Sequence, residues 1–172
     1  MRFLFLSPLR TTLLLAWLVL GPGALFVLAQ PETAPTREQR IADRVVAEVN
    51  AFRQKRGLSP FTSSPELGQA AAAHSQDMSS HGFFNHVSPV PGRARPVDRA
   101  RAFGYPSSTI AENLFMCAGP ADQEIPGQCV QAWADSAGHL RNMTDTLRTE
   151  IGVGVATTPA GETYITAVFG KP

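Results

Sequence analysis

Residues 151–169 have the sequence IGVGVATTPAGETYITAVF, which contains two runs of strand-forming residues around a polar turn. The runs are Ile151–Thr157 and Thr163–Phe169, and the five residues between them include a proline and a glycine. β-Branched and aromatic residues favour strands, and a loop of three to five residues that contains glycine is typical of a hairpin. The stretch therefore predicts an antiparallel β-hairpin near the end of the chain.

Helical patterns precede this hairpin. One helix is predicted to begin after Thr36, which forms a capping box with Gln39, and to end near Gly57. A second is predicted to begin at Ser64-Pro65 and to end near Gly82. Two shorter helices are expected at Pro96–Phe103 and Val130–Ser136. Because helices come first and strands late, the order predicts an α+β fold in which helices cover an antiparallel sheet.

The composition excludes several classes of protein. The 172 residues are 44% hydrophobic and 17% charged, which is typical of one globular domain. The net charge of +1 gives no bulk positive field for a nucleic-acid partner. Two cysteines are too few for a disulfide-built miniprotein or a four-cysteine zinc site.

The N-terminus has the pattern of an export signal. Arg2 and Arg10 precede the apolar run Leu13–Leu20, and small residues follow at Val27 and Ala29. We expect a signal peptide at 1–29, a linker at 30–36 and one domain at 37–172, with no integral membrane span in the mature chain. The alternative is an uncleaved anchor. Either way the domain is expected to be secreted or periplasmic.

The expected location bears on the two cysteines. In an oxidising compartment Cys117 and Cys129 are expected to form a disulfide across a loop rich in proline and glycine. Closing so short a loop contributes about 3 kcal/mol on the chain-entropy model. The alternative is a pair of buried free thiols.

Three polar residues are candidates for a functional site. Glu112 lies in the run Ala111–Leu114, where an unpaired charge is costly. His86, in a loop with aromatic residues and prolines, and His139, after the fourth helix, are potential partners for this carboxylate. Two histidines and one carboxylate also form a zinc-type ligand set, although their spacing has no local periodicity.

Other candidate residues have simpler interpretations. His74 is expected to be a packed, hydrogen-bonded core residue, and His81 to complement the end of a helix. Ser136 lies in a sequence similar to a nucleophile elbow, but we expect a helix before it and a loop after it, which does not fit that motif. Four arginines are expected to form a solvated face: Arg93, Arg95, Arg99 and Arg101.

Five short motifs, taken in order, resemble one family. They are His74–Met78, Gly82–Pro89, Ala111–Leu114, Trp133–Met143 and the closing Ile151–Val155 with Val168–Gly170. Together they resemble the CAP superfamily, which comprises cysteine-rich secretory proteins, antigen 5 and pathogenesis-related protein 1. The compact chain is similar to the bacterial single-domain SCP-like type.

The resemblance implies an α-β-α sandwich with a central three- or four-stranded antiparallel sheet. It also implies a cleft in which His86, Glu112 and His139 occupy the family positions, and which binds divalent metal in some relatives. Ser136 stands where relatives carry a second glutamate, and this departure weakens a metal or hydrolytic role.

We therefore expect a secreted, non-catalytic module that binds a small apolar ligand (lipid or sterol) or a cell-wall ligand. One alternative is a hydrolase or protease that depends on zinc or magnesium, with His86 and His139 as ligands and Glu112 as base or third ligand. Another is that the three residues form only a buried polar network between the sheet and the fourth helix.

Overall fold

The computed structural model of the chain describes residues 34–172. The predicted signal peptide at 1–29 and most of the predicted linker lie outside the described residues. The helices are α1 (Arg37–Gln54), α2 (Pro65–His81), α3 (Pro96–Ala102), α4 (Ile125–Ala134) and α5 (Ala137–Thr144). The strands are β1 (Thr62–Ser63), β2 (Ala111–Ala118), β3 (Glu150–Thr157) and β4 (Glu162–Gly170). Among the described helices, none has the length and apolar content to cross a membrane.

The four strands form one sheet in the order β1-β3-β4-β2. The predicted hairpin is confirmed as β3 and β4, which pair antiparallel, and β2 pairs antiparallel with the far side of β4. The prediction of a purely antiparallel sheet was wrong in one detail, because β1 pairs parallel with β3. β1 comes from the connection between α1 and α2 rather than from a hairpin, so no tight turn fixes its direction.

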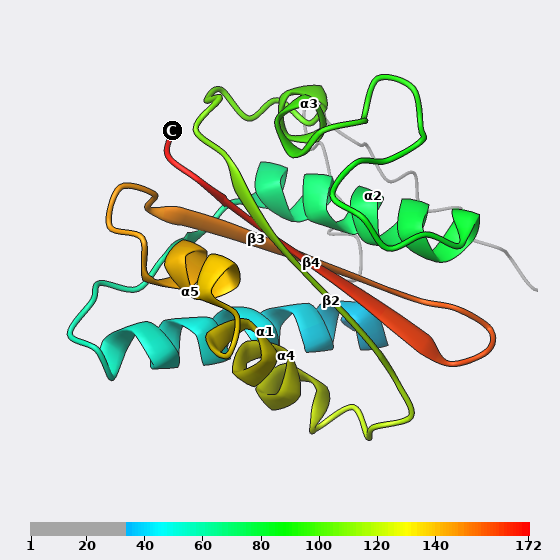
Figure 1. The fold of residues 1–172 in the computed structure, drawn as a ribbon, viewed down its shortest axis with the longest axis horizontal. Coiled ribbons are helices and arrows are strands. Elements are labelled where there is room, and N and C mark those ends of the chain that lie inside the picture. Colours follow the sequence, from blue (N-terminus) through cyan, green and yellow to red (C-terminus); the bar gives the residue numbers. More distant parts are fainter. Residues whose placement is uncertain (1–33) are drawn as a thin grey trace, which may run out of the picture. The chain divides into compact units, whose positions relative to one another are not determined.

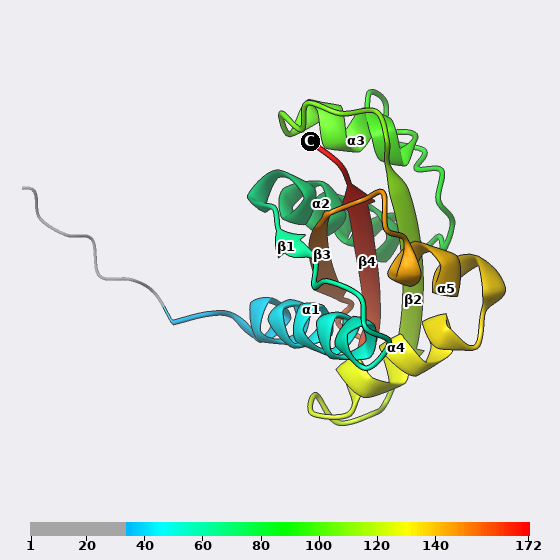
Figure 2. The ribbon, with the colours of Figure 1, turned by 90° about the vertical axis from the view of Figure 1, so that its left-hand side faces the viewer.

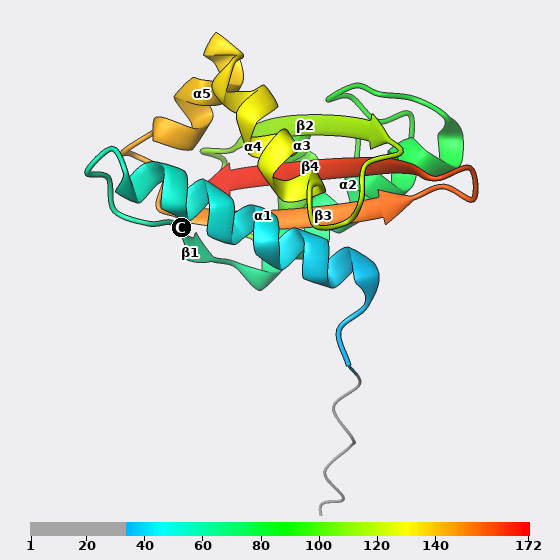
Figure 3. The same ribbon diagram turned by 90° about the horizontal axis from the view of Figure 1, so that it is seen from below.

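Helices cover both faces of this sheet, as the sandwich prediction requires (Figures 1 and 2). On one face α2 packs against β3 and β4, and α3 packs against α2. On the other face α1 packs against β3, while α4 and α5 pack against β2. Figure 3 shows α1 lying along the sheet on this second face.

Two glycines of β3 let α2 approach the sheet closely. A Cβ built on Gly152 lies 2.1 Å from the backbone nitrogen of Gly68, and one built on Gly154 lies 2.0 Å from that of Ala72. Real Cβ atoms do not approach other atoms this closely, so only glycine fits at these two strand positions. The alternating glycines of the closing stretch therefore set the spacing between β3 and the alanine-rich α2.

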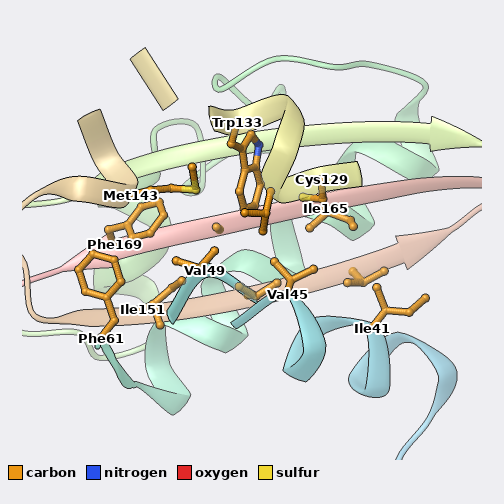
Figure 4. Packing of buried hydrophobic residues seen from close by; sticks show 14 of the residues in the cluster. Ile41, Val45, Val49, Phe61, Cys129, Trp133, Met143, Ile151, Ile165 and Phe169 are labelled. Carbon is orange, nitrogen blue, oxygen red and sulfur yellow. The ribbon is translucent and has the colours of Figure 1, made fainter. Parts of the chain in front are cut away.

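The larger core lies on the opposite face (Figure 4). Val45 and Val49 of α1 face Ile151 and Ile165 of the sheet, and all four are fully buried. Trp133 of α4 completes this core. Burying side chains of this size contributes about 1.5–3 kcal/mol each, so this core positions α1 and α4 firmly on the sheet.

The predicted helix signals are confirmed where capping residues were present. Thr36 caps α1 through a reciprocal capping box with Gln39. Ser64 caps α2, which ends at Gly82 in the left-handed conformation. α4 begins earlier than predicted, at Ile125, because Pro126 fits the first helical turn.

The predicted disulfide is not found. Cys117 and Cys129 are both free thiols in the structure. Cys129 is held on α4 inside the main core, whereas Cys117 is held by the β2 ladder and is half-buried. Burial raises the pKa of both thiols.

Candidate functional site

Glu112 lies on β2, and its carboxylate is almost completely buried, with 2% of the side chain exposed. Its Oε1 atom is 2.9 Å from His86 Nδ1, and its Oε2 atom accepts a hydrogen bond of 2.7 Å from Arg99 Nη2. The structure therefore brings His86 and Glu112 together, although they are 26 residues apart. Both carboxylate oxygens are occupied by partners from the chain.

Arg99 of α3 is fully buried and connects Glu112 to the preceding loop. Its guanidinium donates to the main-chain oxygens of His86, Arg93 and Ala94 at 2.9–3.1 Å. The arginine was predicted to lie on a solvated face, and that prediction was wrong. Nothing in the local arginine pattern distinguishes Arg99 from its neighbours, because its carboxylate partner comes from another element.

Loop 83–95 is held at a second point by α2. Arg93 Nη2 donates to Asp77 Oδ1 at 3.0 Å, and Ser88 Oγ donates to Asp77 Oδ2 at 3.2 Å. Both Asp77 and Ser88 are buried. With Arg99, these bonds fix the loop that presents His86.

The His86 side chain is held by the protein at one ring nitrogen and is otherwise half exposed. Its side chain is 51% exposed, while Nδ1 is hydrogen-bonded to the buried Glu112. A carboxylate is an acceptor, so Nδ1 carries the proton in this contact and Nε2 of the neutral ring keeps its lone pair. Histidines that bind metal commonly have this carboxylate-oriented arrangement.

His74 lies behind this pair and is fully buried, as predicted. Its Nε2 atom is 2.9 Å from the main-chain oxygen of Asn85 and 3.8 Å from Glu112 Oε1. Its Nδ1 atom has no hydrogen-bond partner among the described residues. Burial lowers the pKa of His74, although the nearby Glu112 charge opposes this shift.

His139 approaches the same strand from the other face of the sheet. Successive strand residues point to opposite faces, so Asn113 points away from Glu112, toward α5. Asn113 Nδ2 donates to the main-chain oxygen of His139 at 3.1 Å. Asn142 Nδ2 donates to Asn113 Oδ1 at 2.8 Å and to the main-chain oxygen of Glu112 at 3.3 Å.

These contacts place His139 near the site through its backbone. Burial lowers the pKa of the His139 imidazole, and the positive charge that His86 can carry lowers it further. The two histidines are therefore close enough to interact electrostatically. Ser136 precedes α5 as its N-cap residue and is half-buried, but its side chain makes no capping hydrogen bond. The prediction of a loop after Ser136 was wrong, because α5 follows this residue. A nucleophile elbow also needs a strand before the serine, and here helix α4 precedes it.

Exposed apolar side chains flank His86 in the same loop. Phe84 is 49% exposed and Val87 is 57% exposed. The Phe84 ring packs beside Tyr164 of β4, with ring centroids 6.5 Å apart. Tyr164 is buried and pairs across the sheet with Met116, which is exposed like Phe84 and Val87. No sequence pattern identifies these residues as one surface, since only the folded sheet places Phe84 beside β4.

Known proteins share the family and the fold of this chain. The family model described as "Cysteine-rich secretory protein family" (CAP) matches residues 46–169. The uncharacterized protein YkwD of Bacillus subtilis (strain 168) is 37% identical over 139 residues, which are 81% of this chain and 51% of YkwD. The chain thus spans about half the length of this relative.

Solved structures show the same fold at lower identity. An extracellular protein containing a SCP domain from Bacillus anthracis str. Ames has a TM-score of 0.66 and 23% identity, covering 78% of this chain and 41% of that one. The structure of NaASP2 with Zn²⁺ has a TM-score of 0.58 and 14% identity, covering 81% and 84%. The family match, the relative and the shared sandwich agree with the five motifs, and the chain therefore belongs to the cysteine-rich secretory protein family, CAP.

Proposed function

We propose that this CAP domain is a non-catalytic, extracytoplasmic binding module whose ligand lies against the surface around His86. The ligand is a cell-wall fragment or a small apolar molecule such as a lipid or sterol. His86 supplies a polar contact through Nε2, and Phe84 and Val87 supply apolar contacts from the same loop.

One observation carries the proposal: both oxygens of the Glu112 carboxylate are already bound, to His86 and to Arg99. A general base must reach the proton that it removes, directly or through one water. Glu112 is buried and faces two donors from its own chain, so this geometry favours a role in orienting His86 over a role in proton transfer.

The exposure of the surface bears on the kind of ligand. Sites for apolar small molecules usually enclose most of the ligand surface. Phe84 and His86 are each about half exposed, so a ligand seated on them keeps one side in water. This arrangement favours a cell-wall fragment, whose sugar rings and peptide groups suit an aromatic and an imidazole contact, over a sterol.

Titration of the purified protein tests the proposal. Soluble wall fragments and a panel of lipids are titrated separately, with binding measured by calorimetry. We expect saturable binding of a wall fragment that weakens about tenfold in Phe84→Ala and in His86→Ala, which corresponds to about 1.4 kcal/mol. His81→Ala is the matched control, since within residues 34–172 the His81 ring is hydrogen-bonded only to the main-chain oxygen of Asp77 in its own helix. Absence of saturable binding to every member of both panels contradicts the proposal.

A second candidate is a divalent-metal-dependent hydrolase or protease. It is supported by the orientation of His86, whose Nε2 lone pair is available as a ligand, with His139 as the second ligand. A zinc or magnesium ion bound there would supply a Lewis acid. However, no group of three or more potential ligands occurs among residues 34–172, whereas catalytic zinc commonly has three protein ligands. The residues present fit a weak two-histidine site better than a catalytic centre.

Metal analysis separates the two candidates. We expect no stoichiometric zinc or magnesium in protein prepared without chelator, and binding of wall fragments that is unchanged by EDTA. One equivalent of metal that disappears in His86→Ala/His139→Ala, together with hydrolysis of a protein or wall substrate, supports the hydrolase instead.

A further inference from the structure

We propose that a second site, on the first two turns of α1, binds a phosphate group. The residues that line it form a pocket of about 180 Å³ and come from α1 and from the turn before α4: Arg37, Arg40, Ile41, Arg44, Asp122 and Gln123. None of these residues contributes to the surface around His86.

The three arginines lie on one face of α1 at helical spacing. Arg40 and Arg44 are four residues apart, a spacing at which like charges repel on a helix. Arg37 also begins the helix, where the helix dipole favours negative groups. A bound anion relieves the repulsion between Arg40 and Arg44.

The Arg37 guanidinium already has hydrogen-bond partners within the protein. Its Nε and Nη2 atoms donate to Asp122, and its Nη1 atom donates to Thr157 Oγ1. Asp122 thus neutralises Arg37, and this arginine in turn lowers the pKa of Asp122. Arg37 and Asp122 together form one fixed wall of the pocket.

Arg40 and Arg44 have no carboxylate partner among the described residues. Arg40 Nη1 donates to the main-chain oxygen of Pro35, and Arg44 Nη2 donates at 2.9 Å to that of Gln123. A guanidinium has five donors, so four on each side chain have no partner in the described part of the chain. The two bonds hold the guanidiniums beside the pocket with no carboxylate in direct contact. The Arg40 charge also helps to lower the pKa of Asp122, which is already paired with Arg37.

Two unpaired guanidiniums match a phosphate group in charge and in geometry. A phosphate monoester carries a charge of about −1.5 to −2 near neutral pH, and arginine binds phosphate oxygens with two parallel bonds. The pocket is smaller than the 300–1,000 Å³ typical of sites for drug-sized ligands, so it suits a single phosphate rather than a large molecule. The phosphate belongs to an anionic lipid headgroup or to a soluble phosphate compound.

The experiment distinguishes these sources. The purified protein is titrated with inorganic phosphate, with sodium acetate at equal ionic strength, and with vesicles of phosphatidylglycerol or phosphatidylcholine. We expect saturable binding of phosphate or of phosphatidylglycerol vesicles, about tenfold weaker in Arg40→Gln/Arg44→Gln and weakened by salt. Arg101→Gln, at an exposed arginine of α3, is the matched control and is expected to bind as the wild type does.

The result either identifies the source of the phosphate group or overturns the proposed phosphate site. Binding of inorganic phosphate indicates a soluble ligand, and binding only of phosphatidylglycerol vesicles indicates a headgroup. The proposal is overturned if neither binds, if acetate binds equally well, or if the double variant binds as tightly as Arg101→Gln.

Discussion

At the scale of single residues, the site depends on a buried carboxylate that is paired with a buried guanidinium. Glu112 and Arg99 are both inaccessible to water and lie 2.7 Å apart. Burying two charges is costly, and the cost is recovered only when further hydrogen bonds satisfy the remaining donors and acceptors. His86 and three main-chain oxygens meet most of that requirement here, while Arg99 Nε has no partner among the described residues.

Removal of Arg99 is therefore expected to destabilise the protein strongly. Arg99→Met leaves the Glu112 charge buried without a cation, and we expect the free energy of unfolding to fall by about 3–5 kcal/mol. Urea denaturation measures this change. Arg95→Met is the control, because Arg95 forms an exposed pair with Asp98, and its loss is expected to change the free energy of unfolding far less. A similar loss in the two variants contradicts the buried-pair account.

The buried histidine behind the pair predicts a pH dependence. The pKa of His74 is lower in the folded protein than its ordinary value of about 6.5, chiefly because the ring is buried. The unfolded chain then binds more protons in this range, so stability falls as the pH drops from about 7 through 6.5. One histidine contributes at most about 1.4 kcal/mol per pH unit.

Denaturation in urea at several pH values between about 7 and 5.5 tests this prediction. His74→Gln is expected to show a smaller slope of stability against pH than the wild type. The lowered pKa of His139 acts in the same direction, so some slope remains in His74→Gln. A His74→Gln variant with the full wild-type slope contradicts the assignment.

The sequence predicted part of this site. Glu112 was identifiable because a carboxylate in an apolar run needs partners, and His86 is indeed one of them. Arg99 was missed, since a buried arginine and a solvated one have the same local sequence pattern. Ring contact between His139 and Glu112 stays a prediction, because the contacts of His139 with β2 run through its main chain.

At the scale of helices and strands, short sequence signals correctly predicted the elements whose ends or conformations depend on neighbouring residues. Capping residues and glycines gave the bounds of α1 and α2, and β-branched runs gave β3 and β4. β2 was not predicted as a strand because Glu112 and Asn113, both buried, interrupt its apolar pattern. β1 has two residues, too few for any periodicity.

The close packing of α2 on β3 gives an element-scale prediction. In Gly154→Ala the new methyl group collides with the backbone of α2, and we expect stability to fall by about 3 kcal/mol or more. Gly127→Ala is the control, since a Cβ there meets nothing within 4 Å and alanine favours the helix interior. Thermal denaturation of both variants measures the difference. A Gly154→Ala protein as stable as Gly127→Ala contradicts the packing that we describe.

At the scale of the whole domain, strand β2 joins the two helical layers at the site. Glu112 points to the α2 and α3 layer, where Arg99 and His86 lie, and Asn113 points to α5. The two histidines therefore come from opposite faces of the sheet. No sequence pattern predicts this arrangement of the two histidines, because it depends on β2 occupying an edge of the sheet.

The hydrogen bonds between Asn142 of α5 and strand β2 lead to a further prediction. Asn142→Ala removes the donor to Asn113 and to the main chain of Glu112, and we expect a loss of about 1–3 kcal/mol. Hydrogen exchange is expected to show faster exchange in α5, while α2 is unchanged. Arg141→Ala, at the exposed neighbouring position, is expected to leave exchange in α5 as it is. Equal exchange in all three proteins contradicts the role of Asn142.

The most direct test of the proposed binding role is nitrogen-15 NMR of the His86 ring during a titration with soluble wall fragments. We predict a saturable change in the His86 Nε2 signal, with Nδ1 still protonated, and ligand signals that show no cleavage. A His86 ring that does not respond while fragments bind elsewhere, or fragments that are hydrolysed during the titration, would contradict this account.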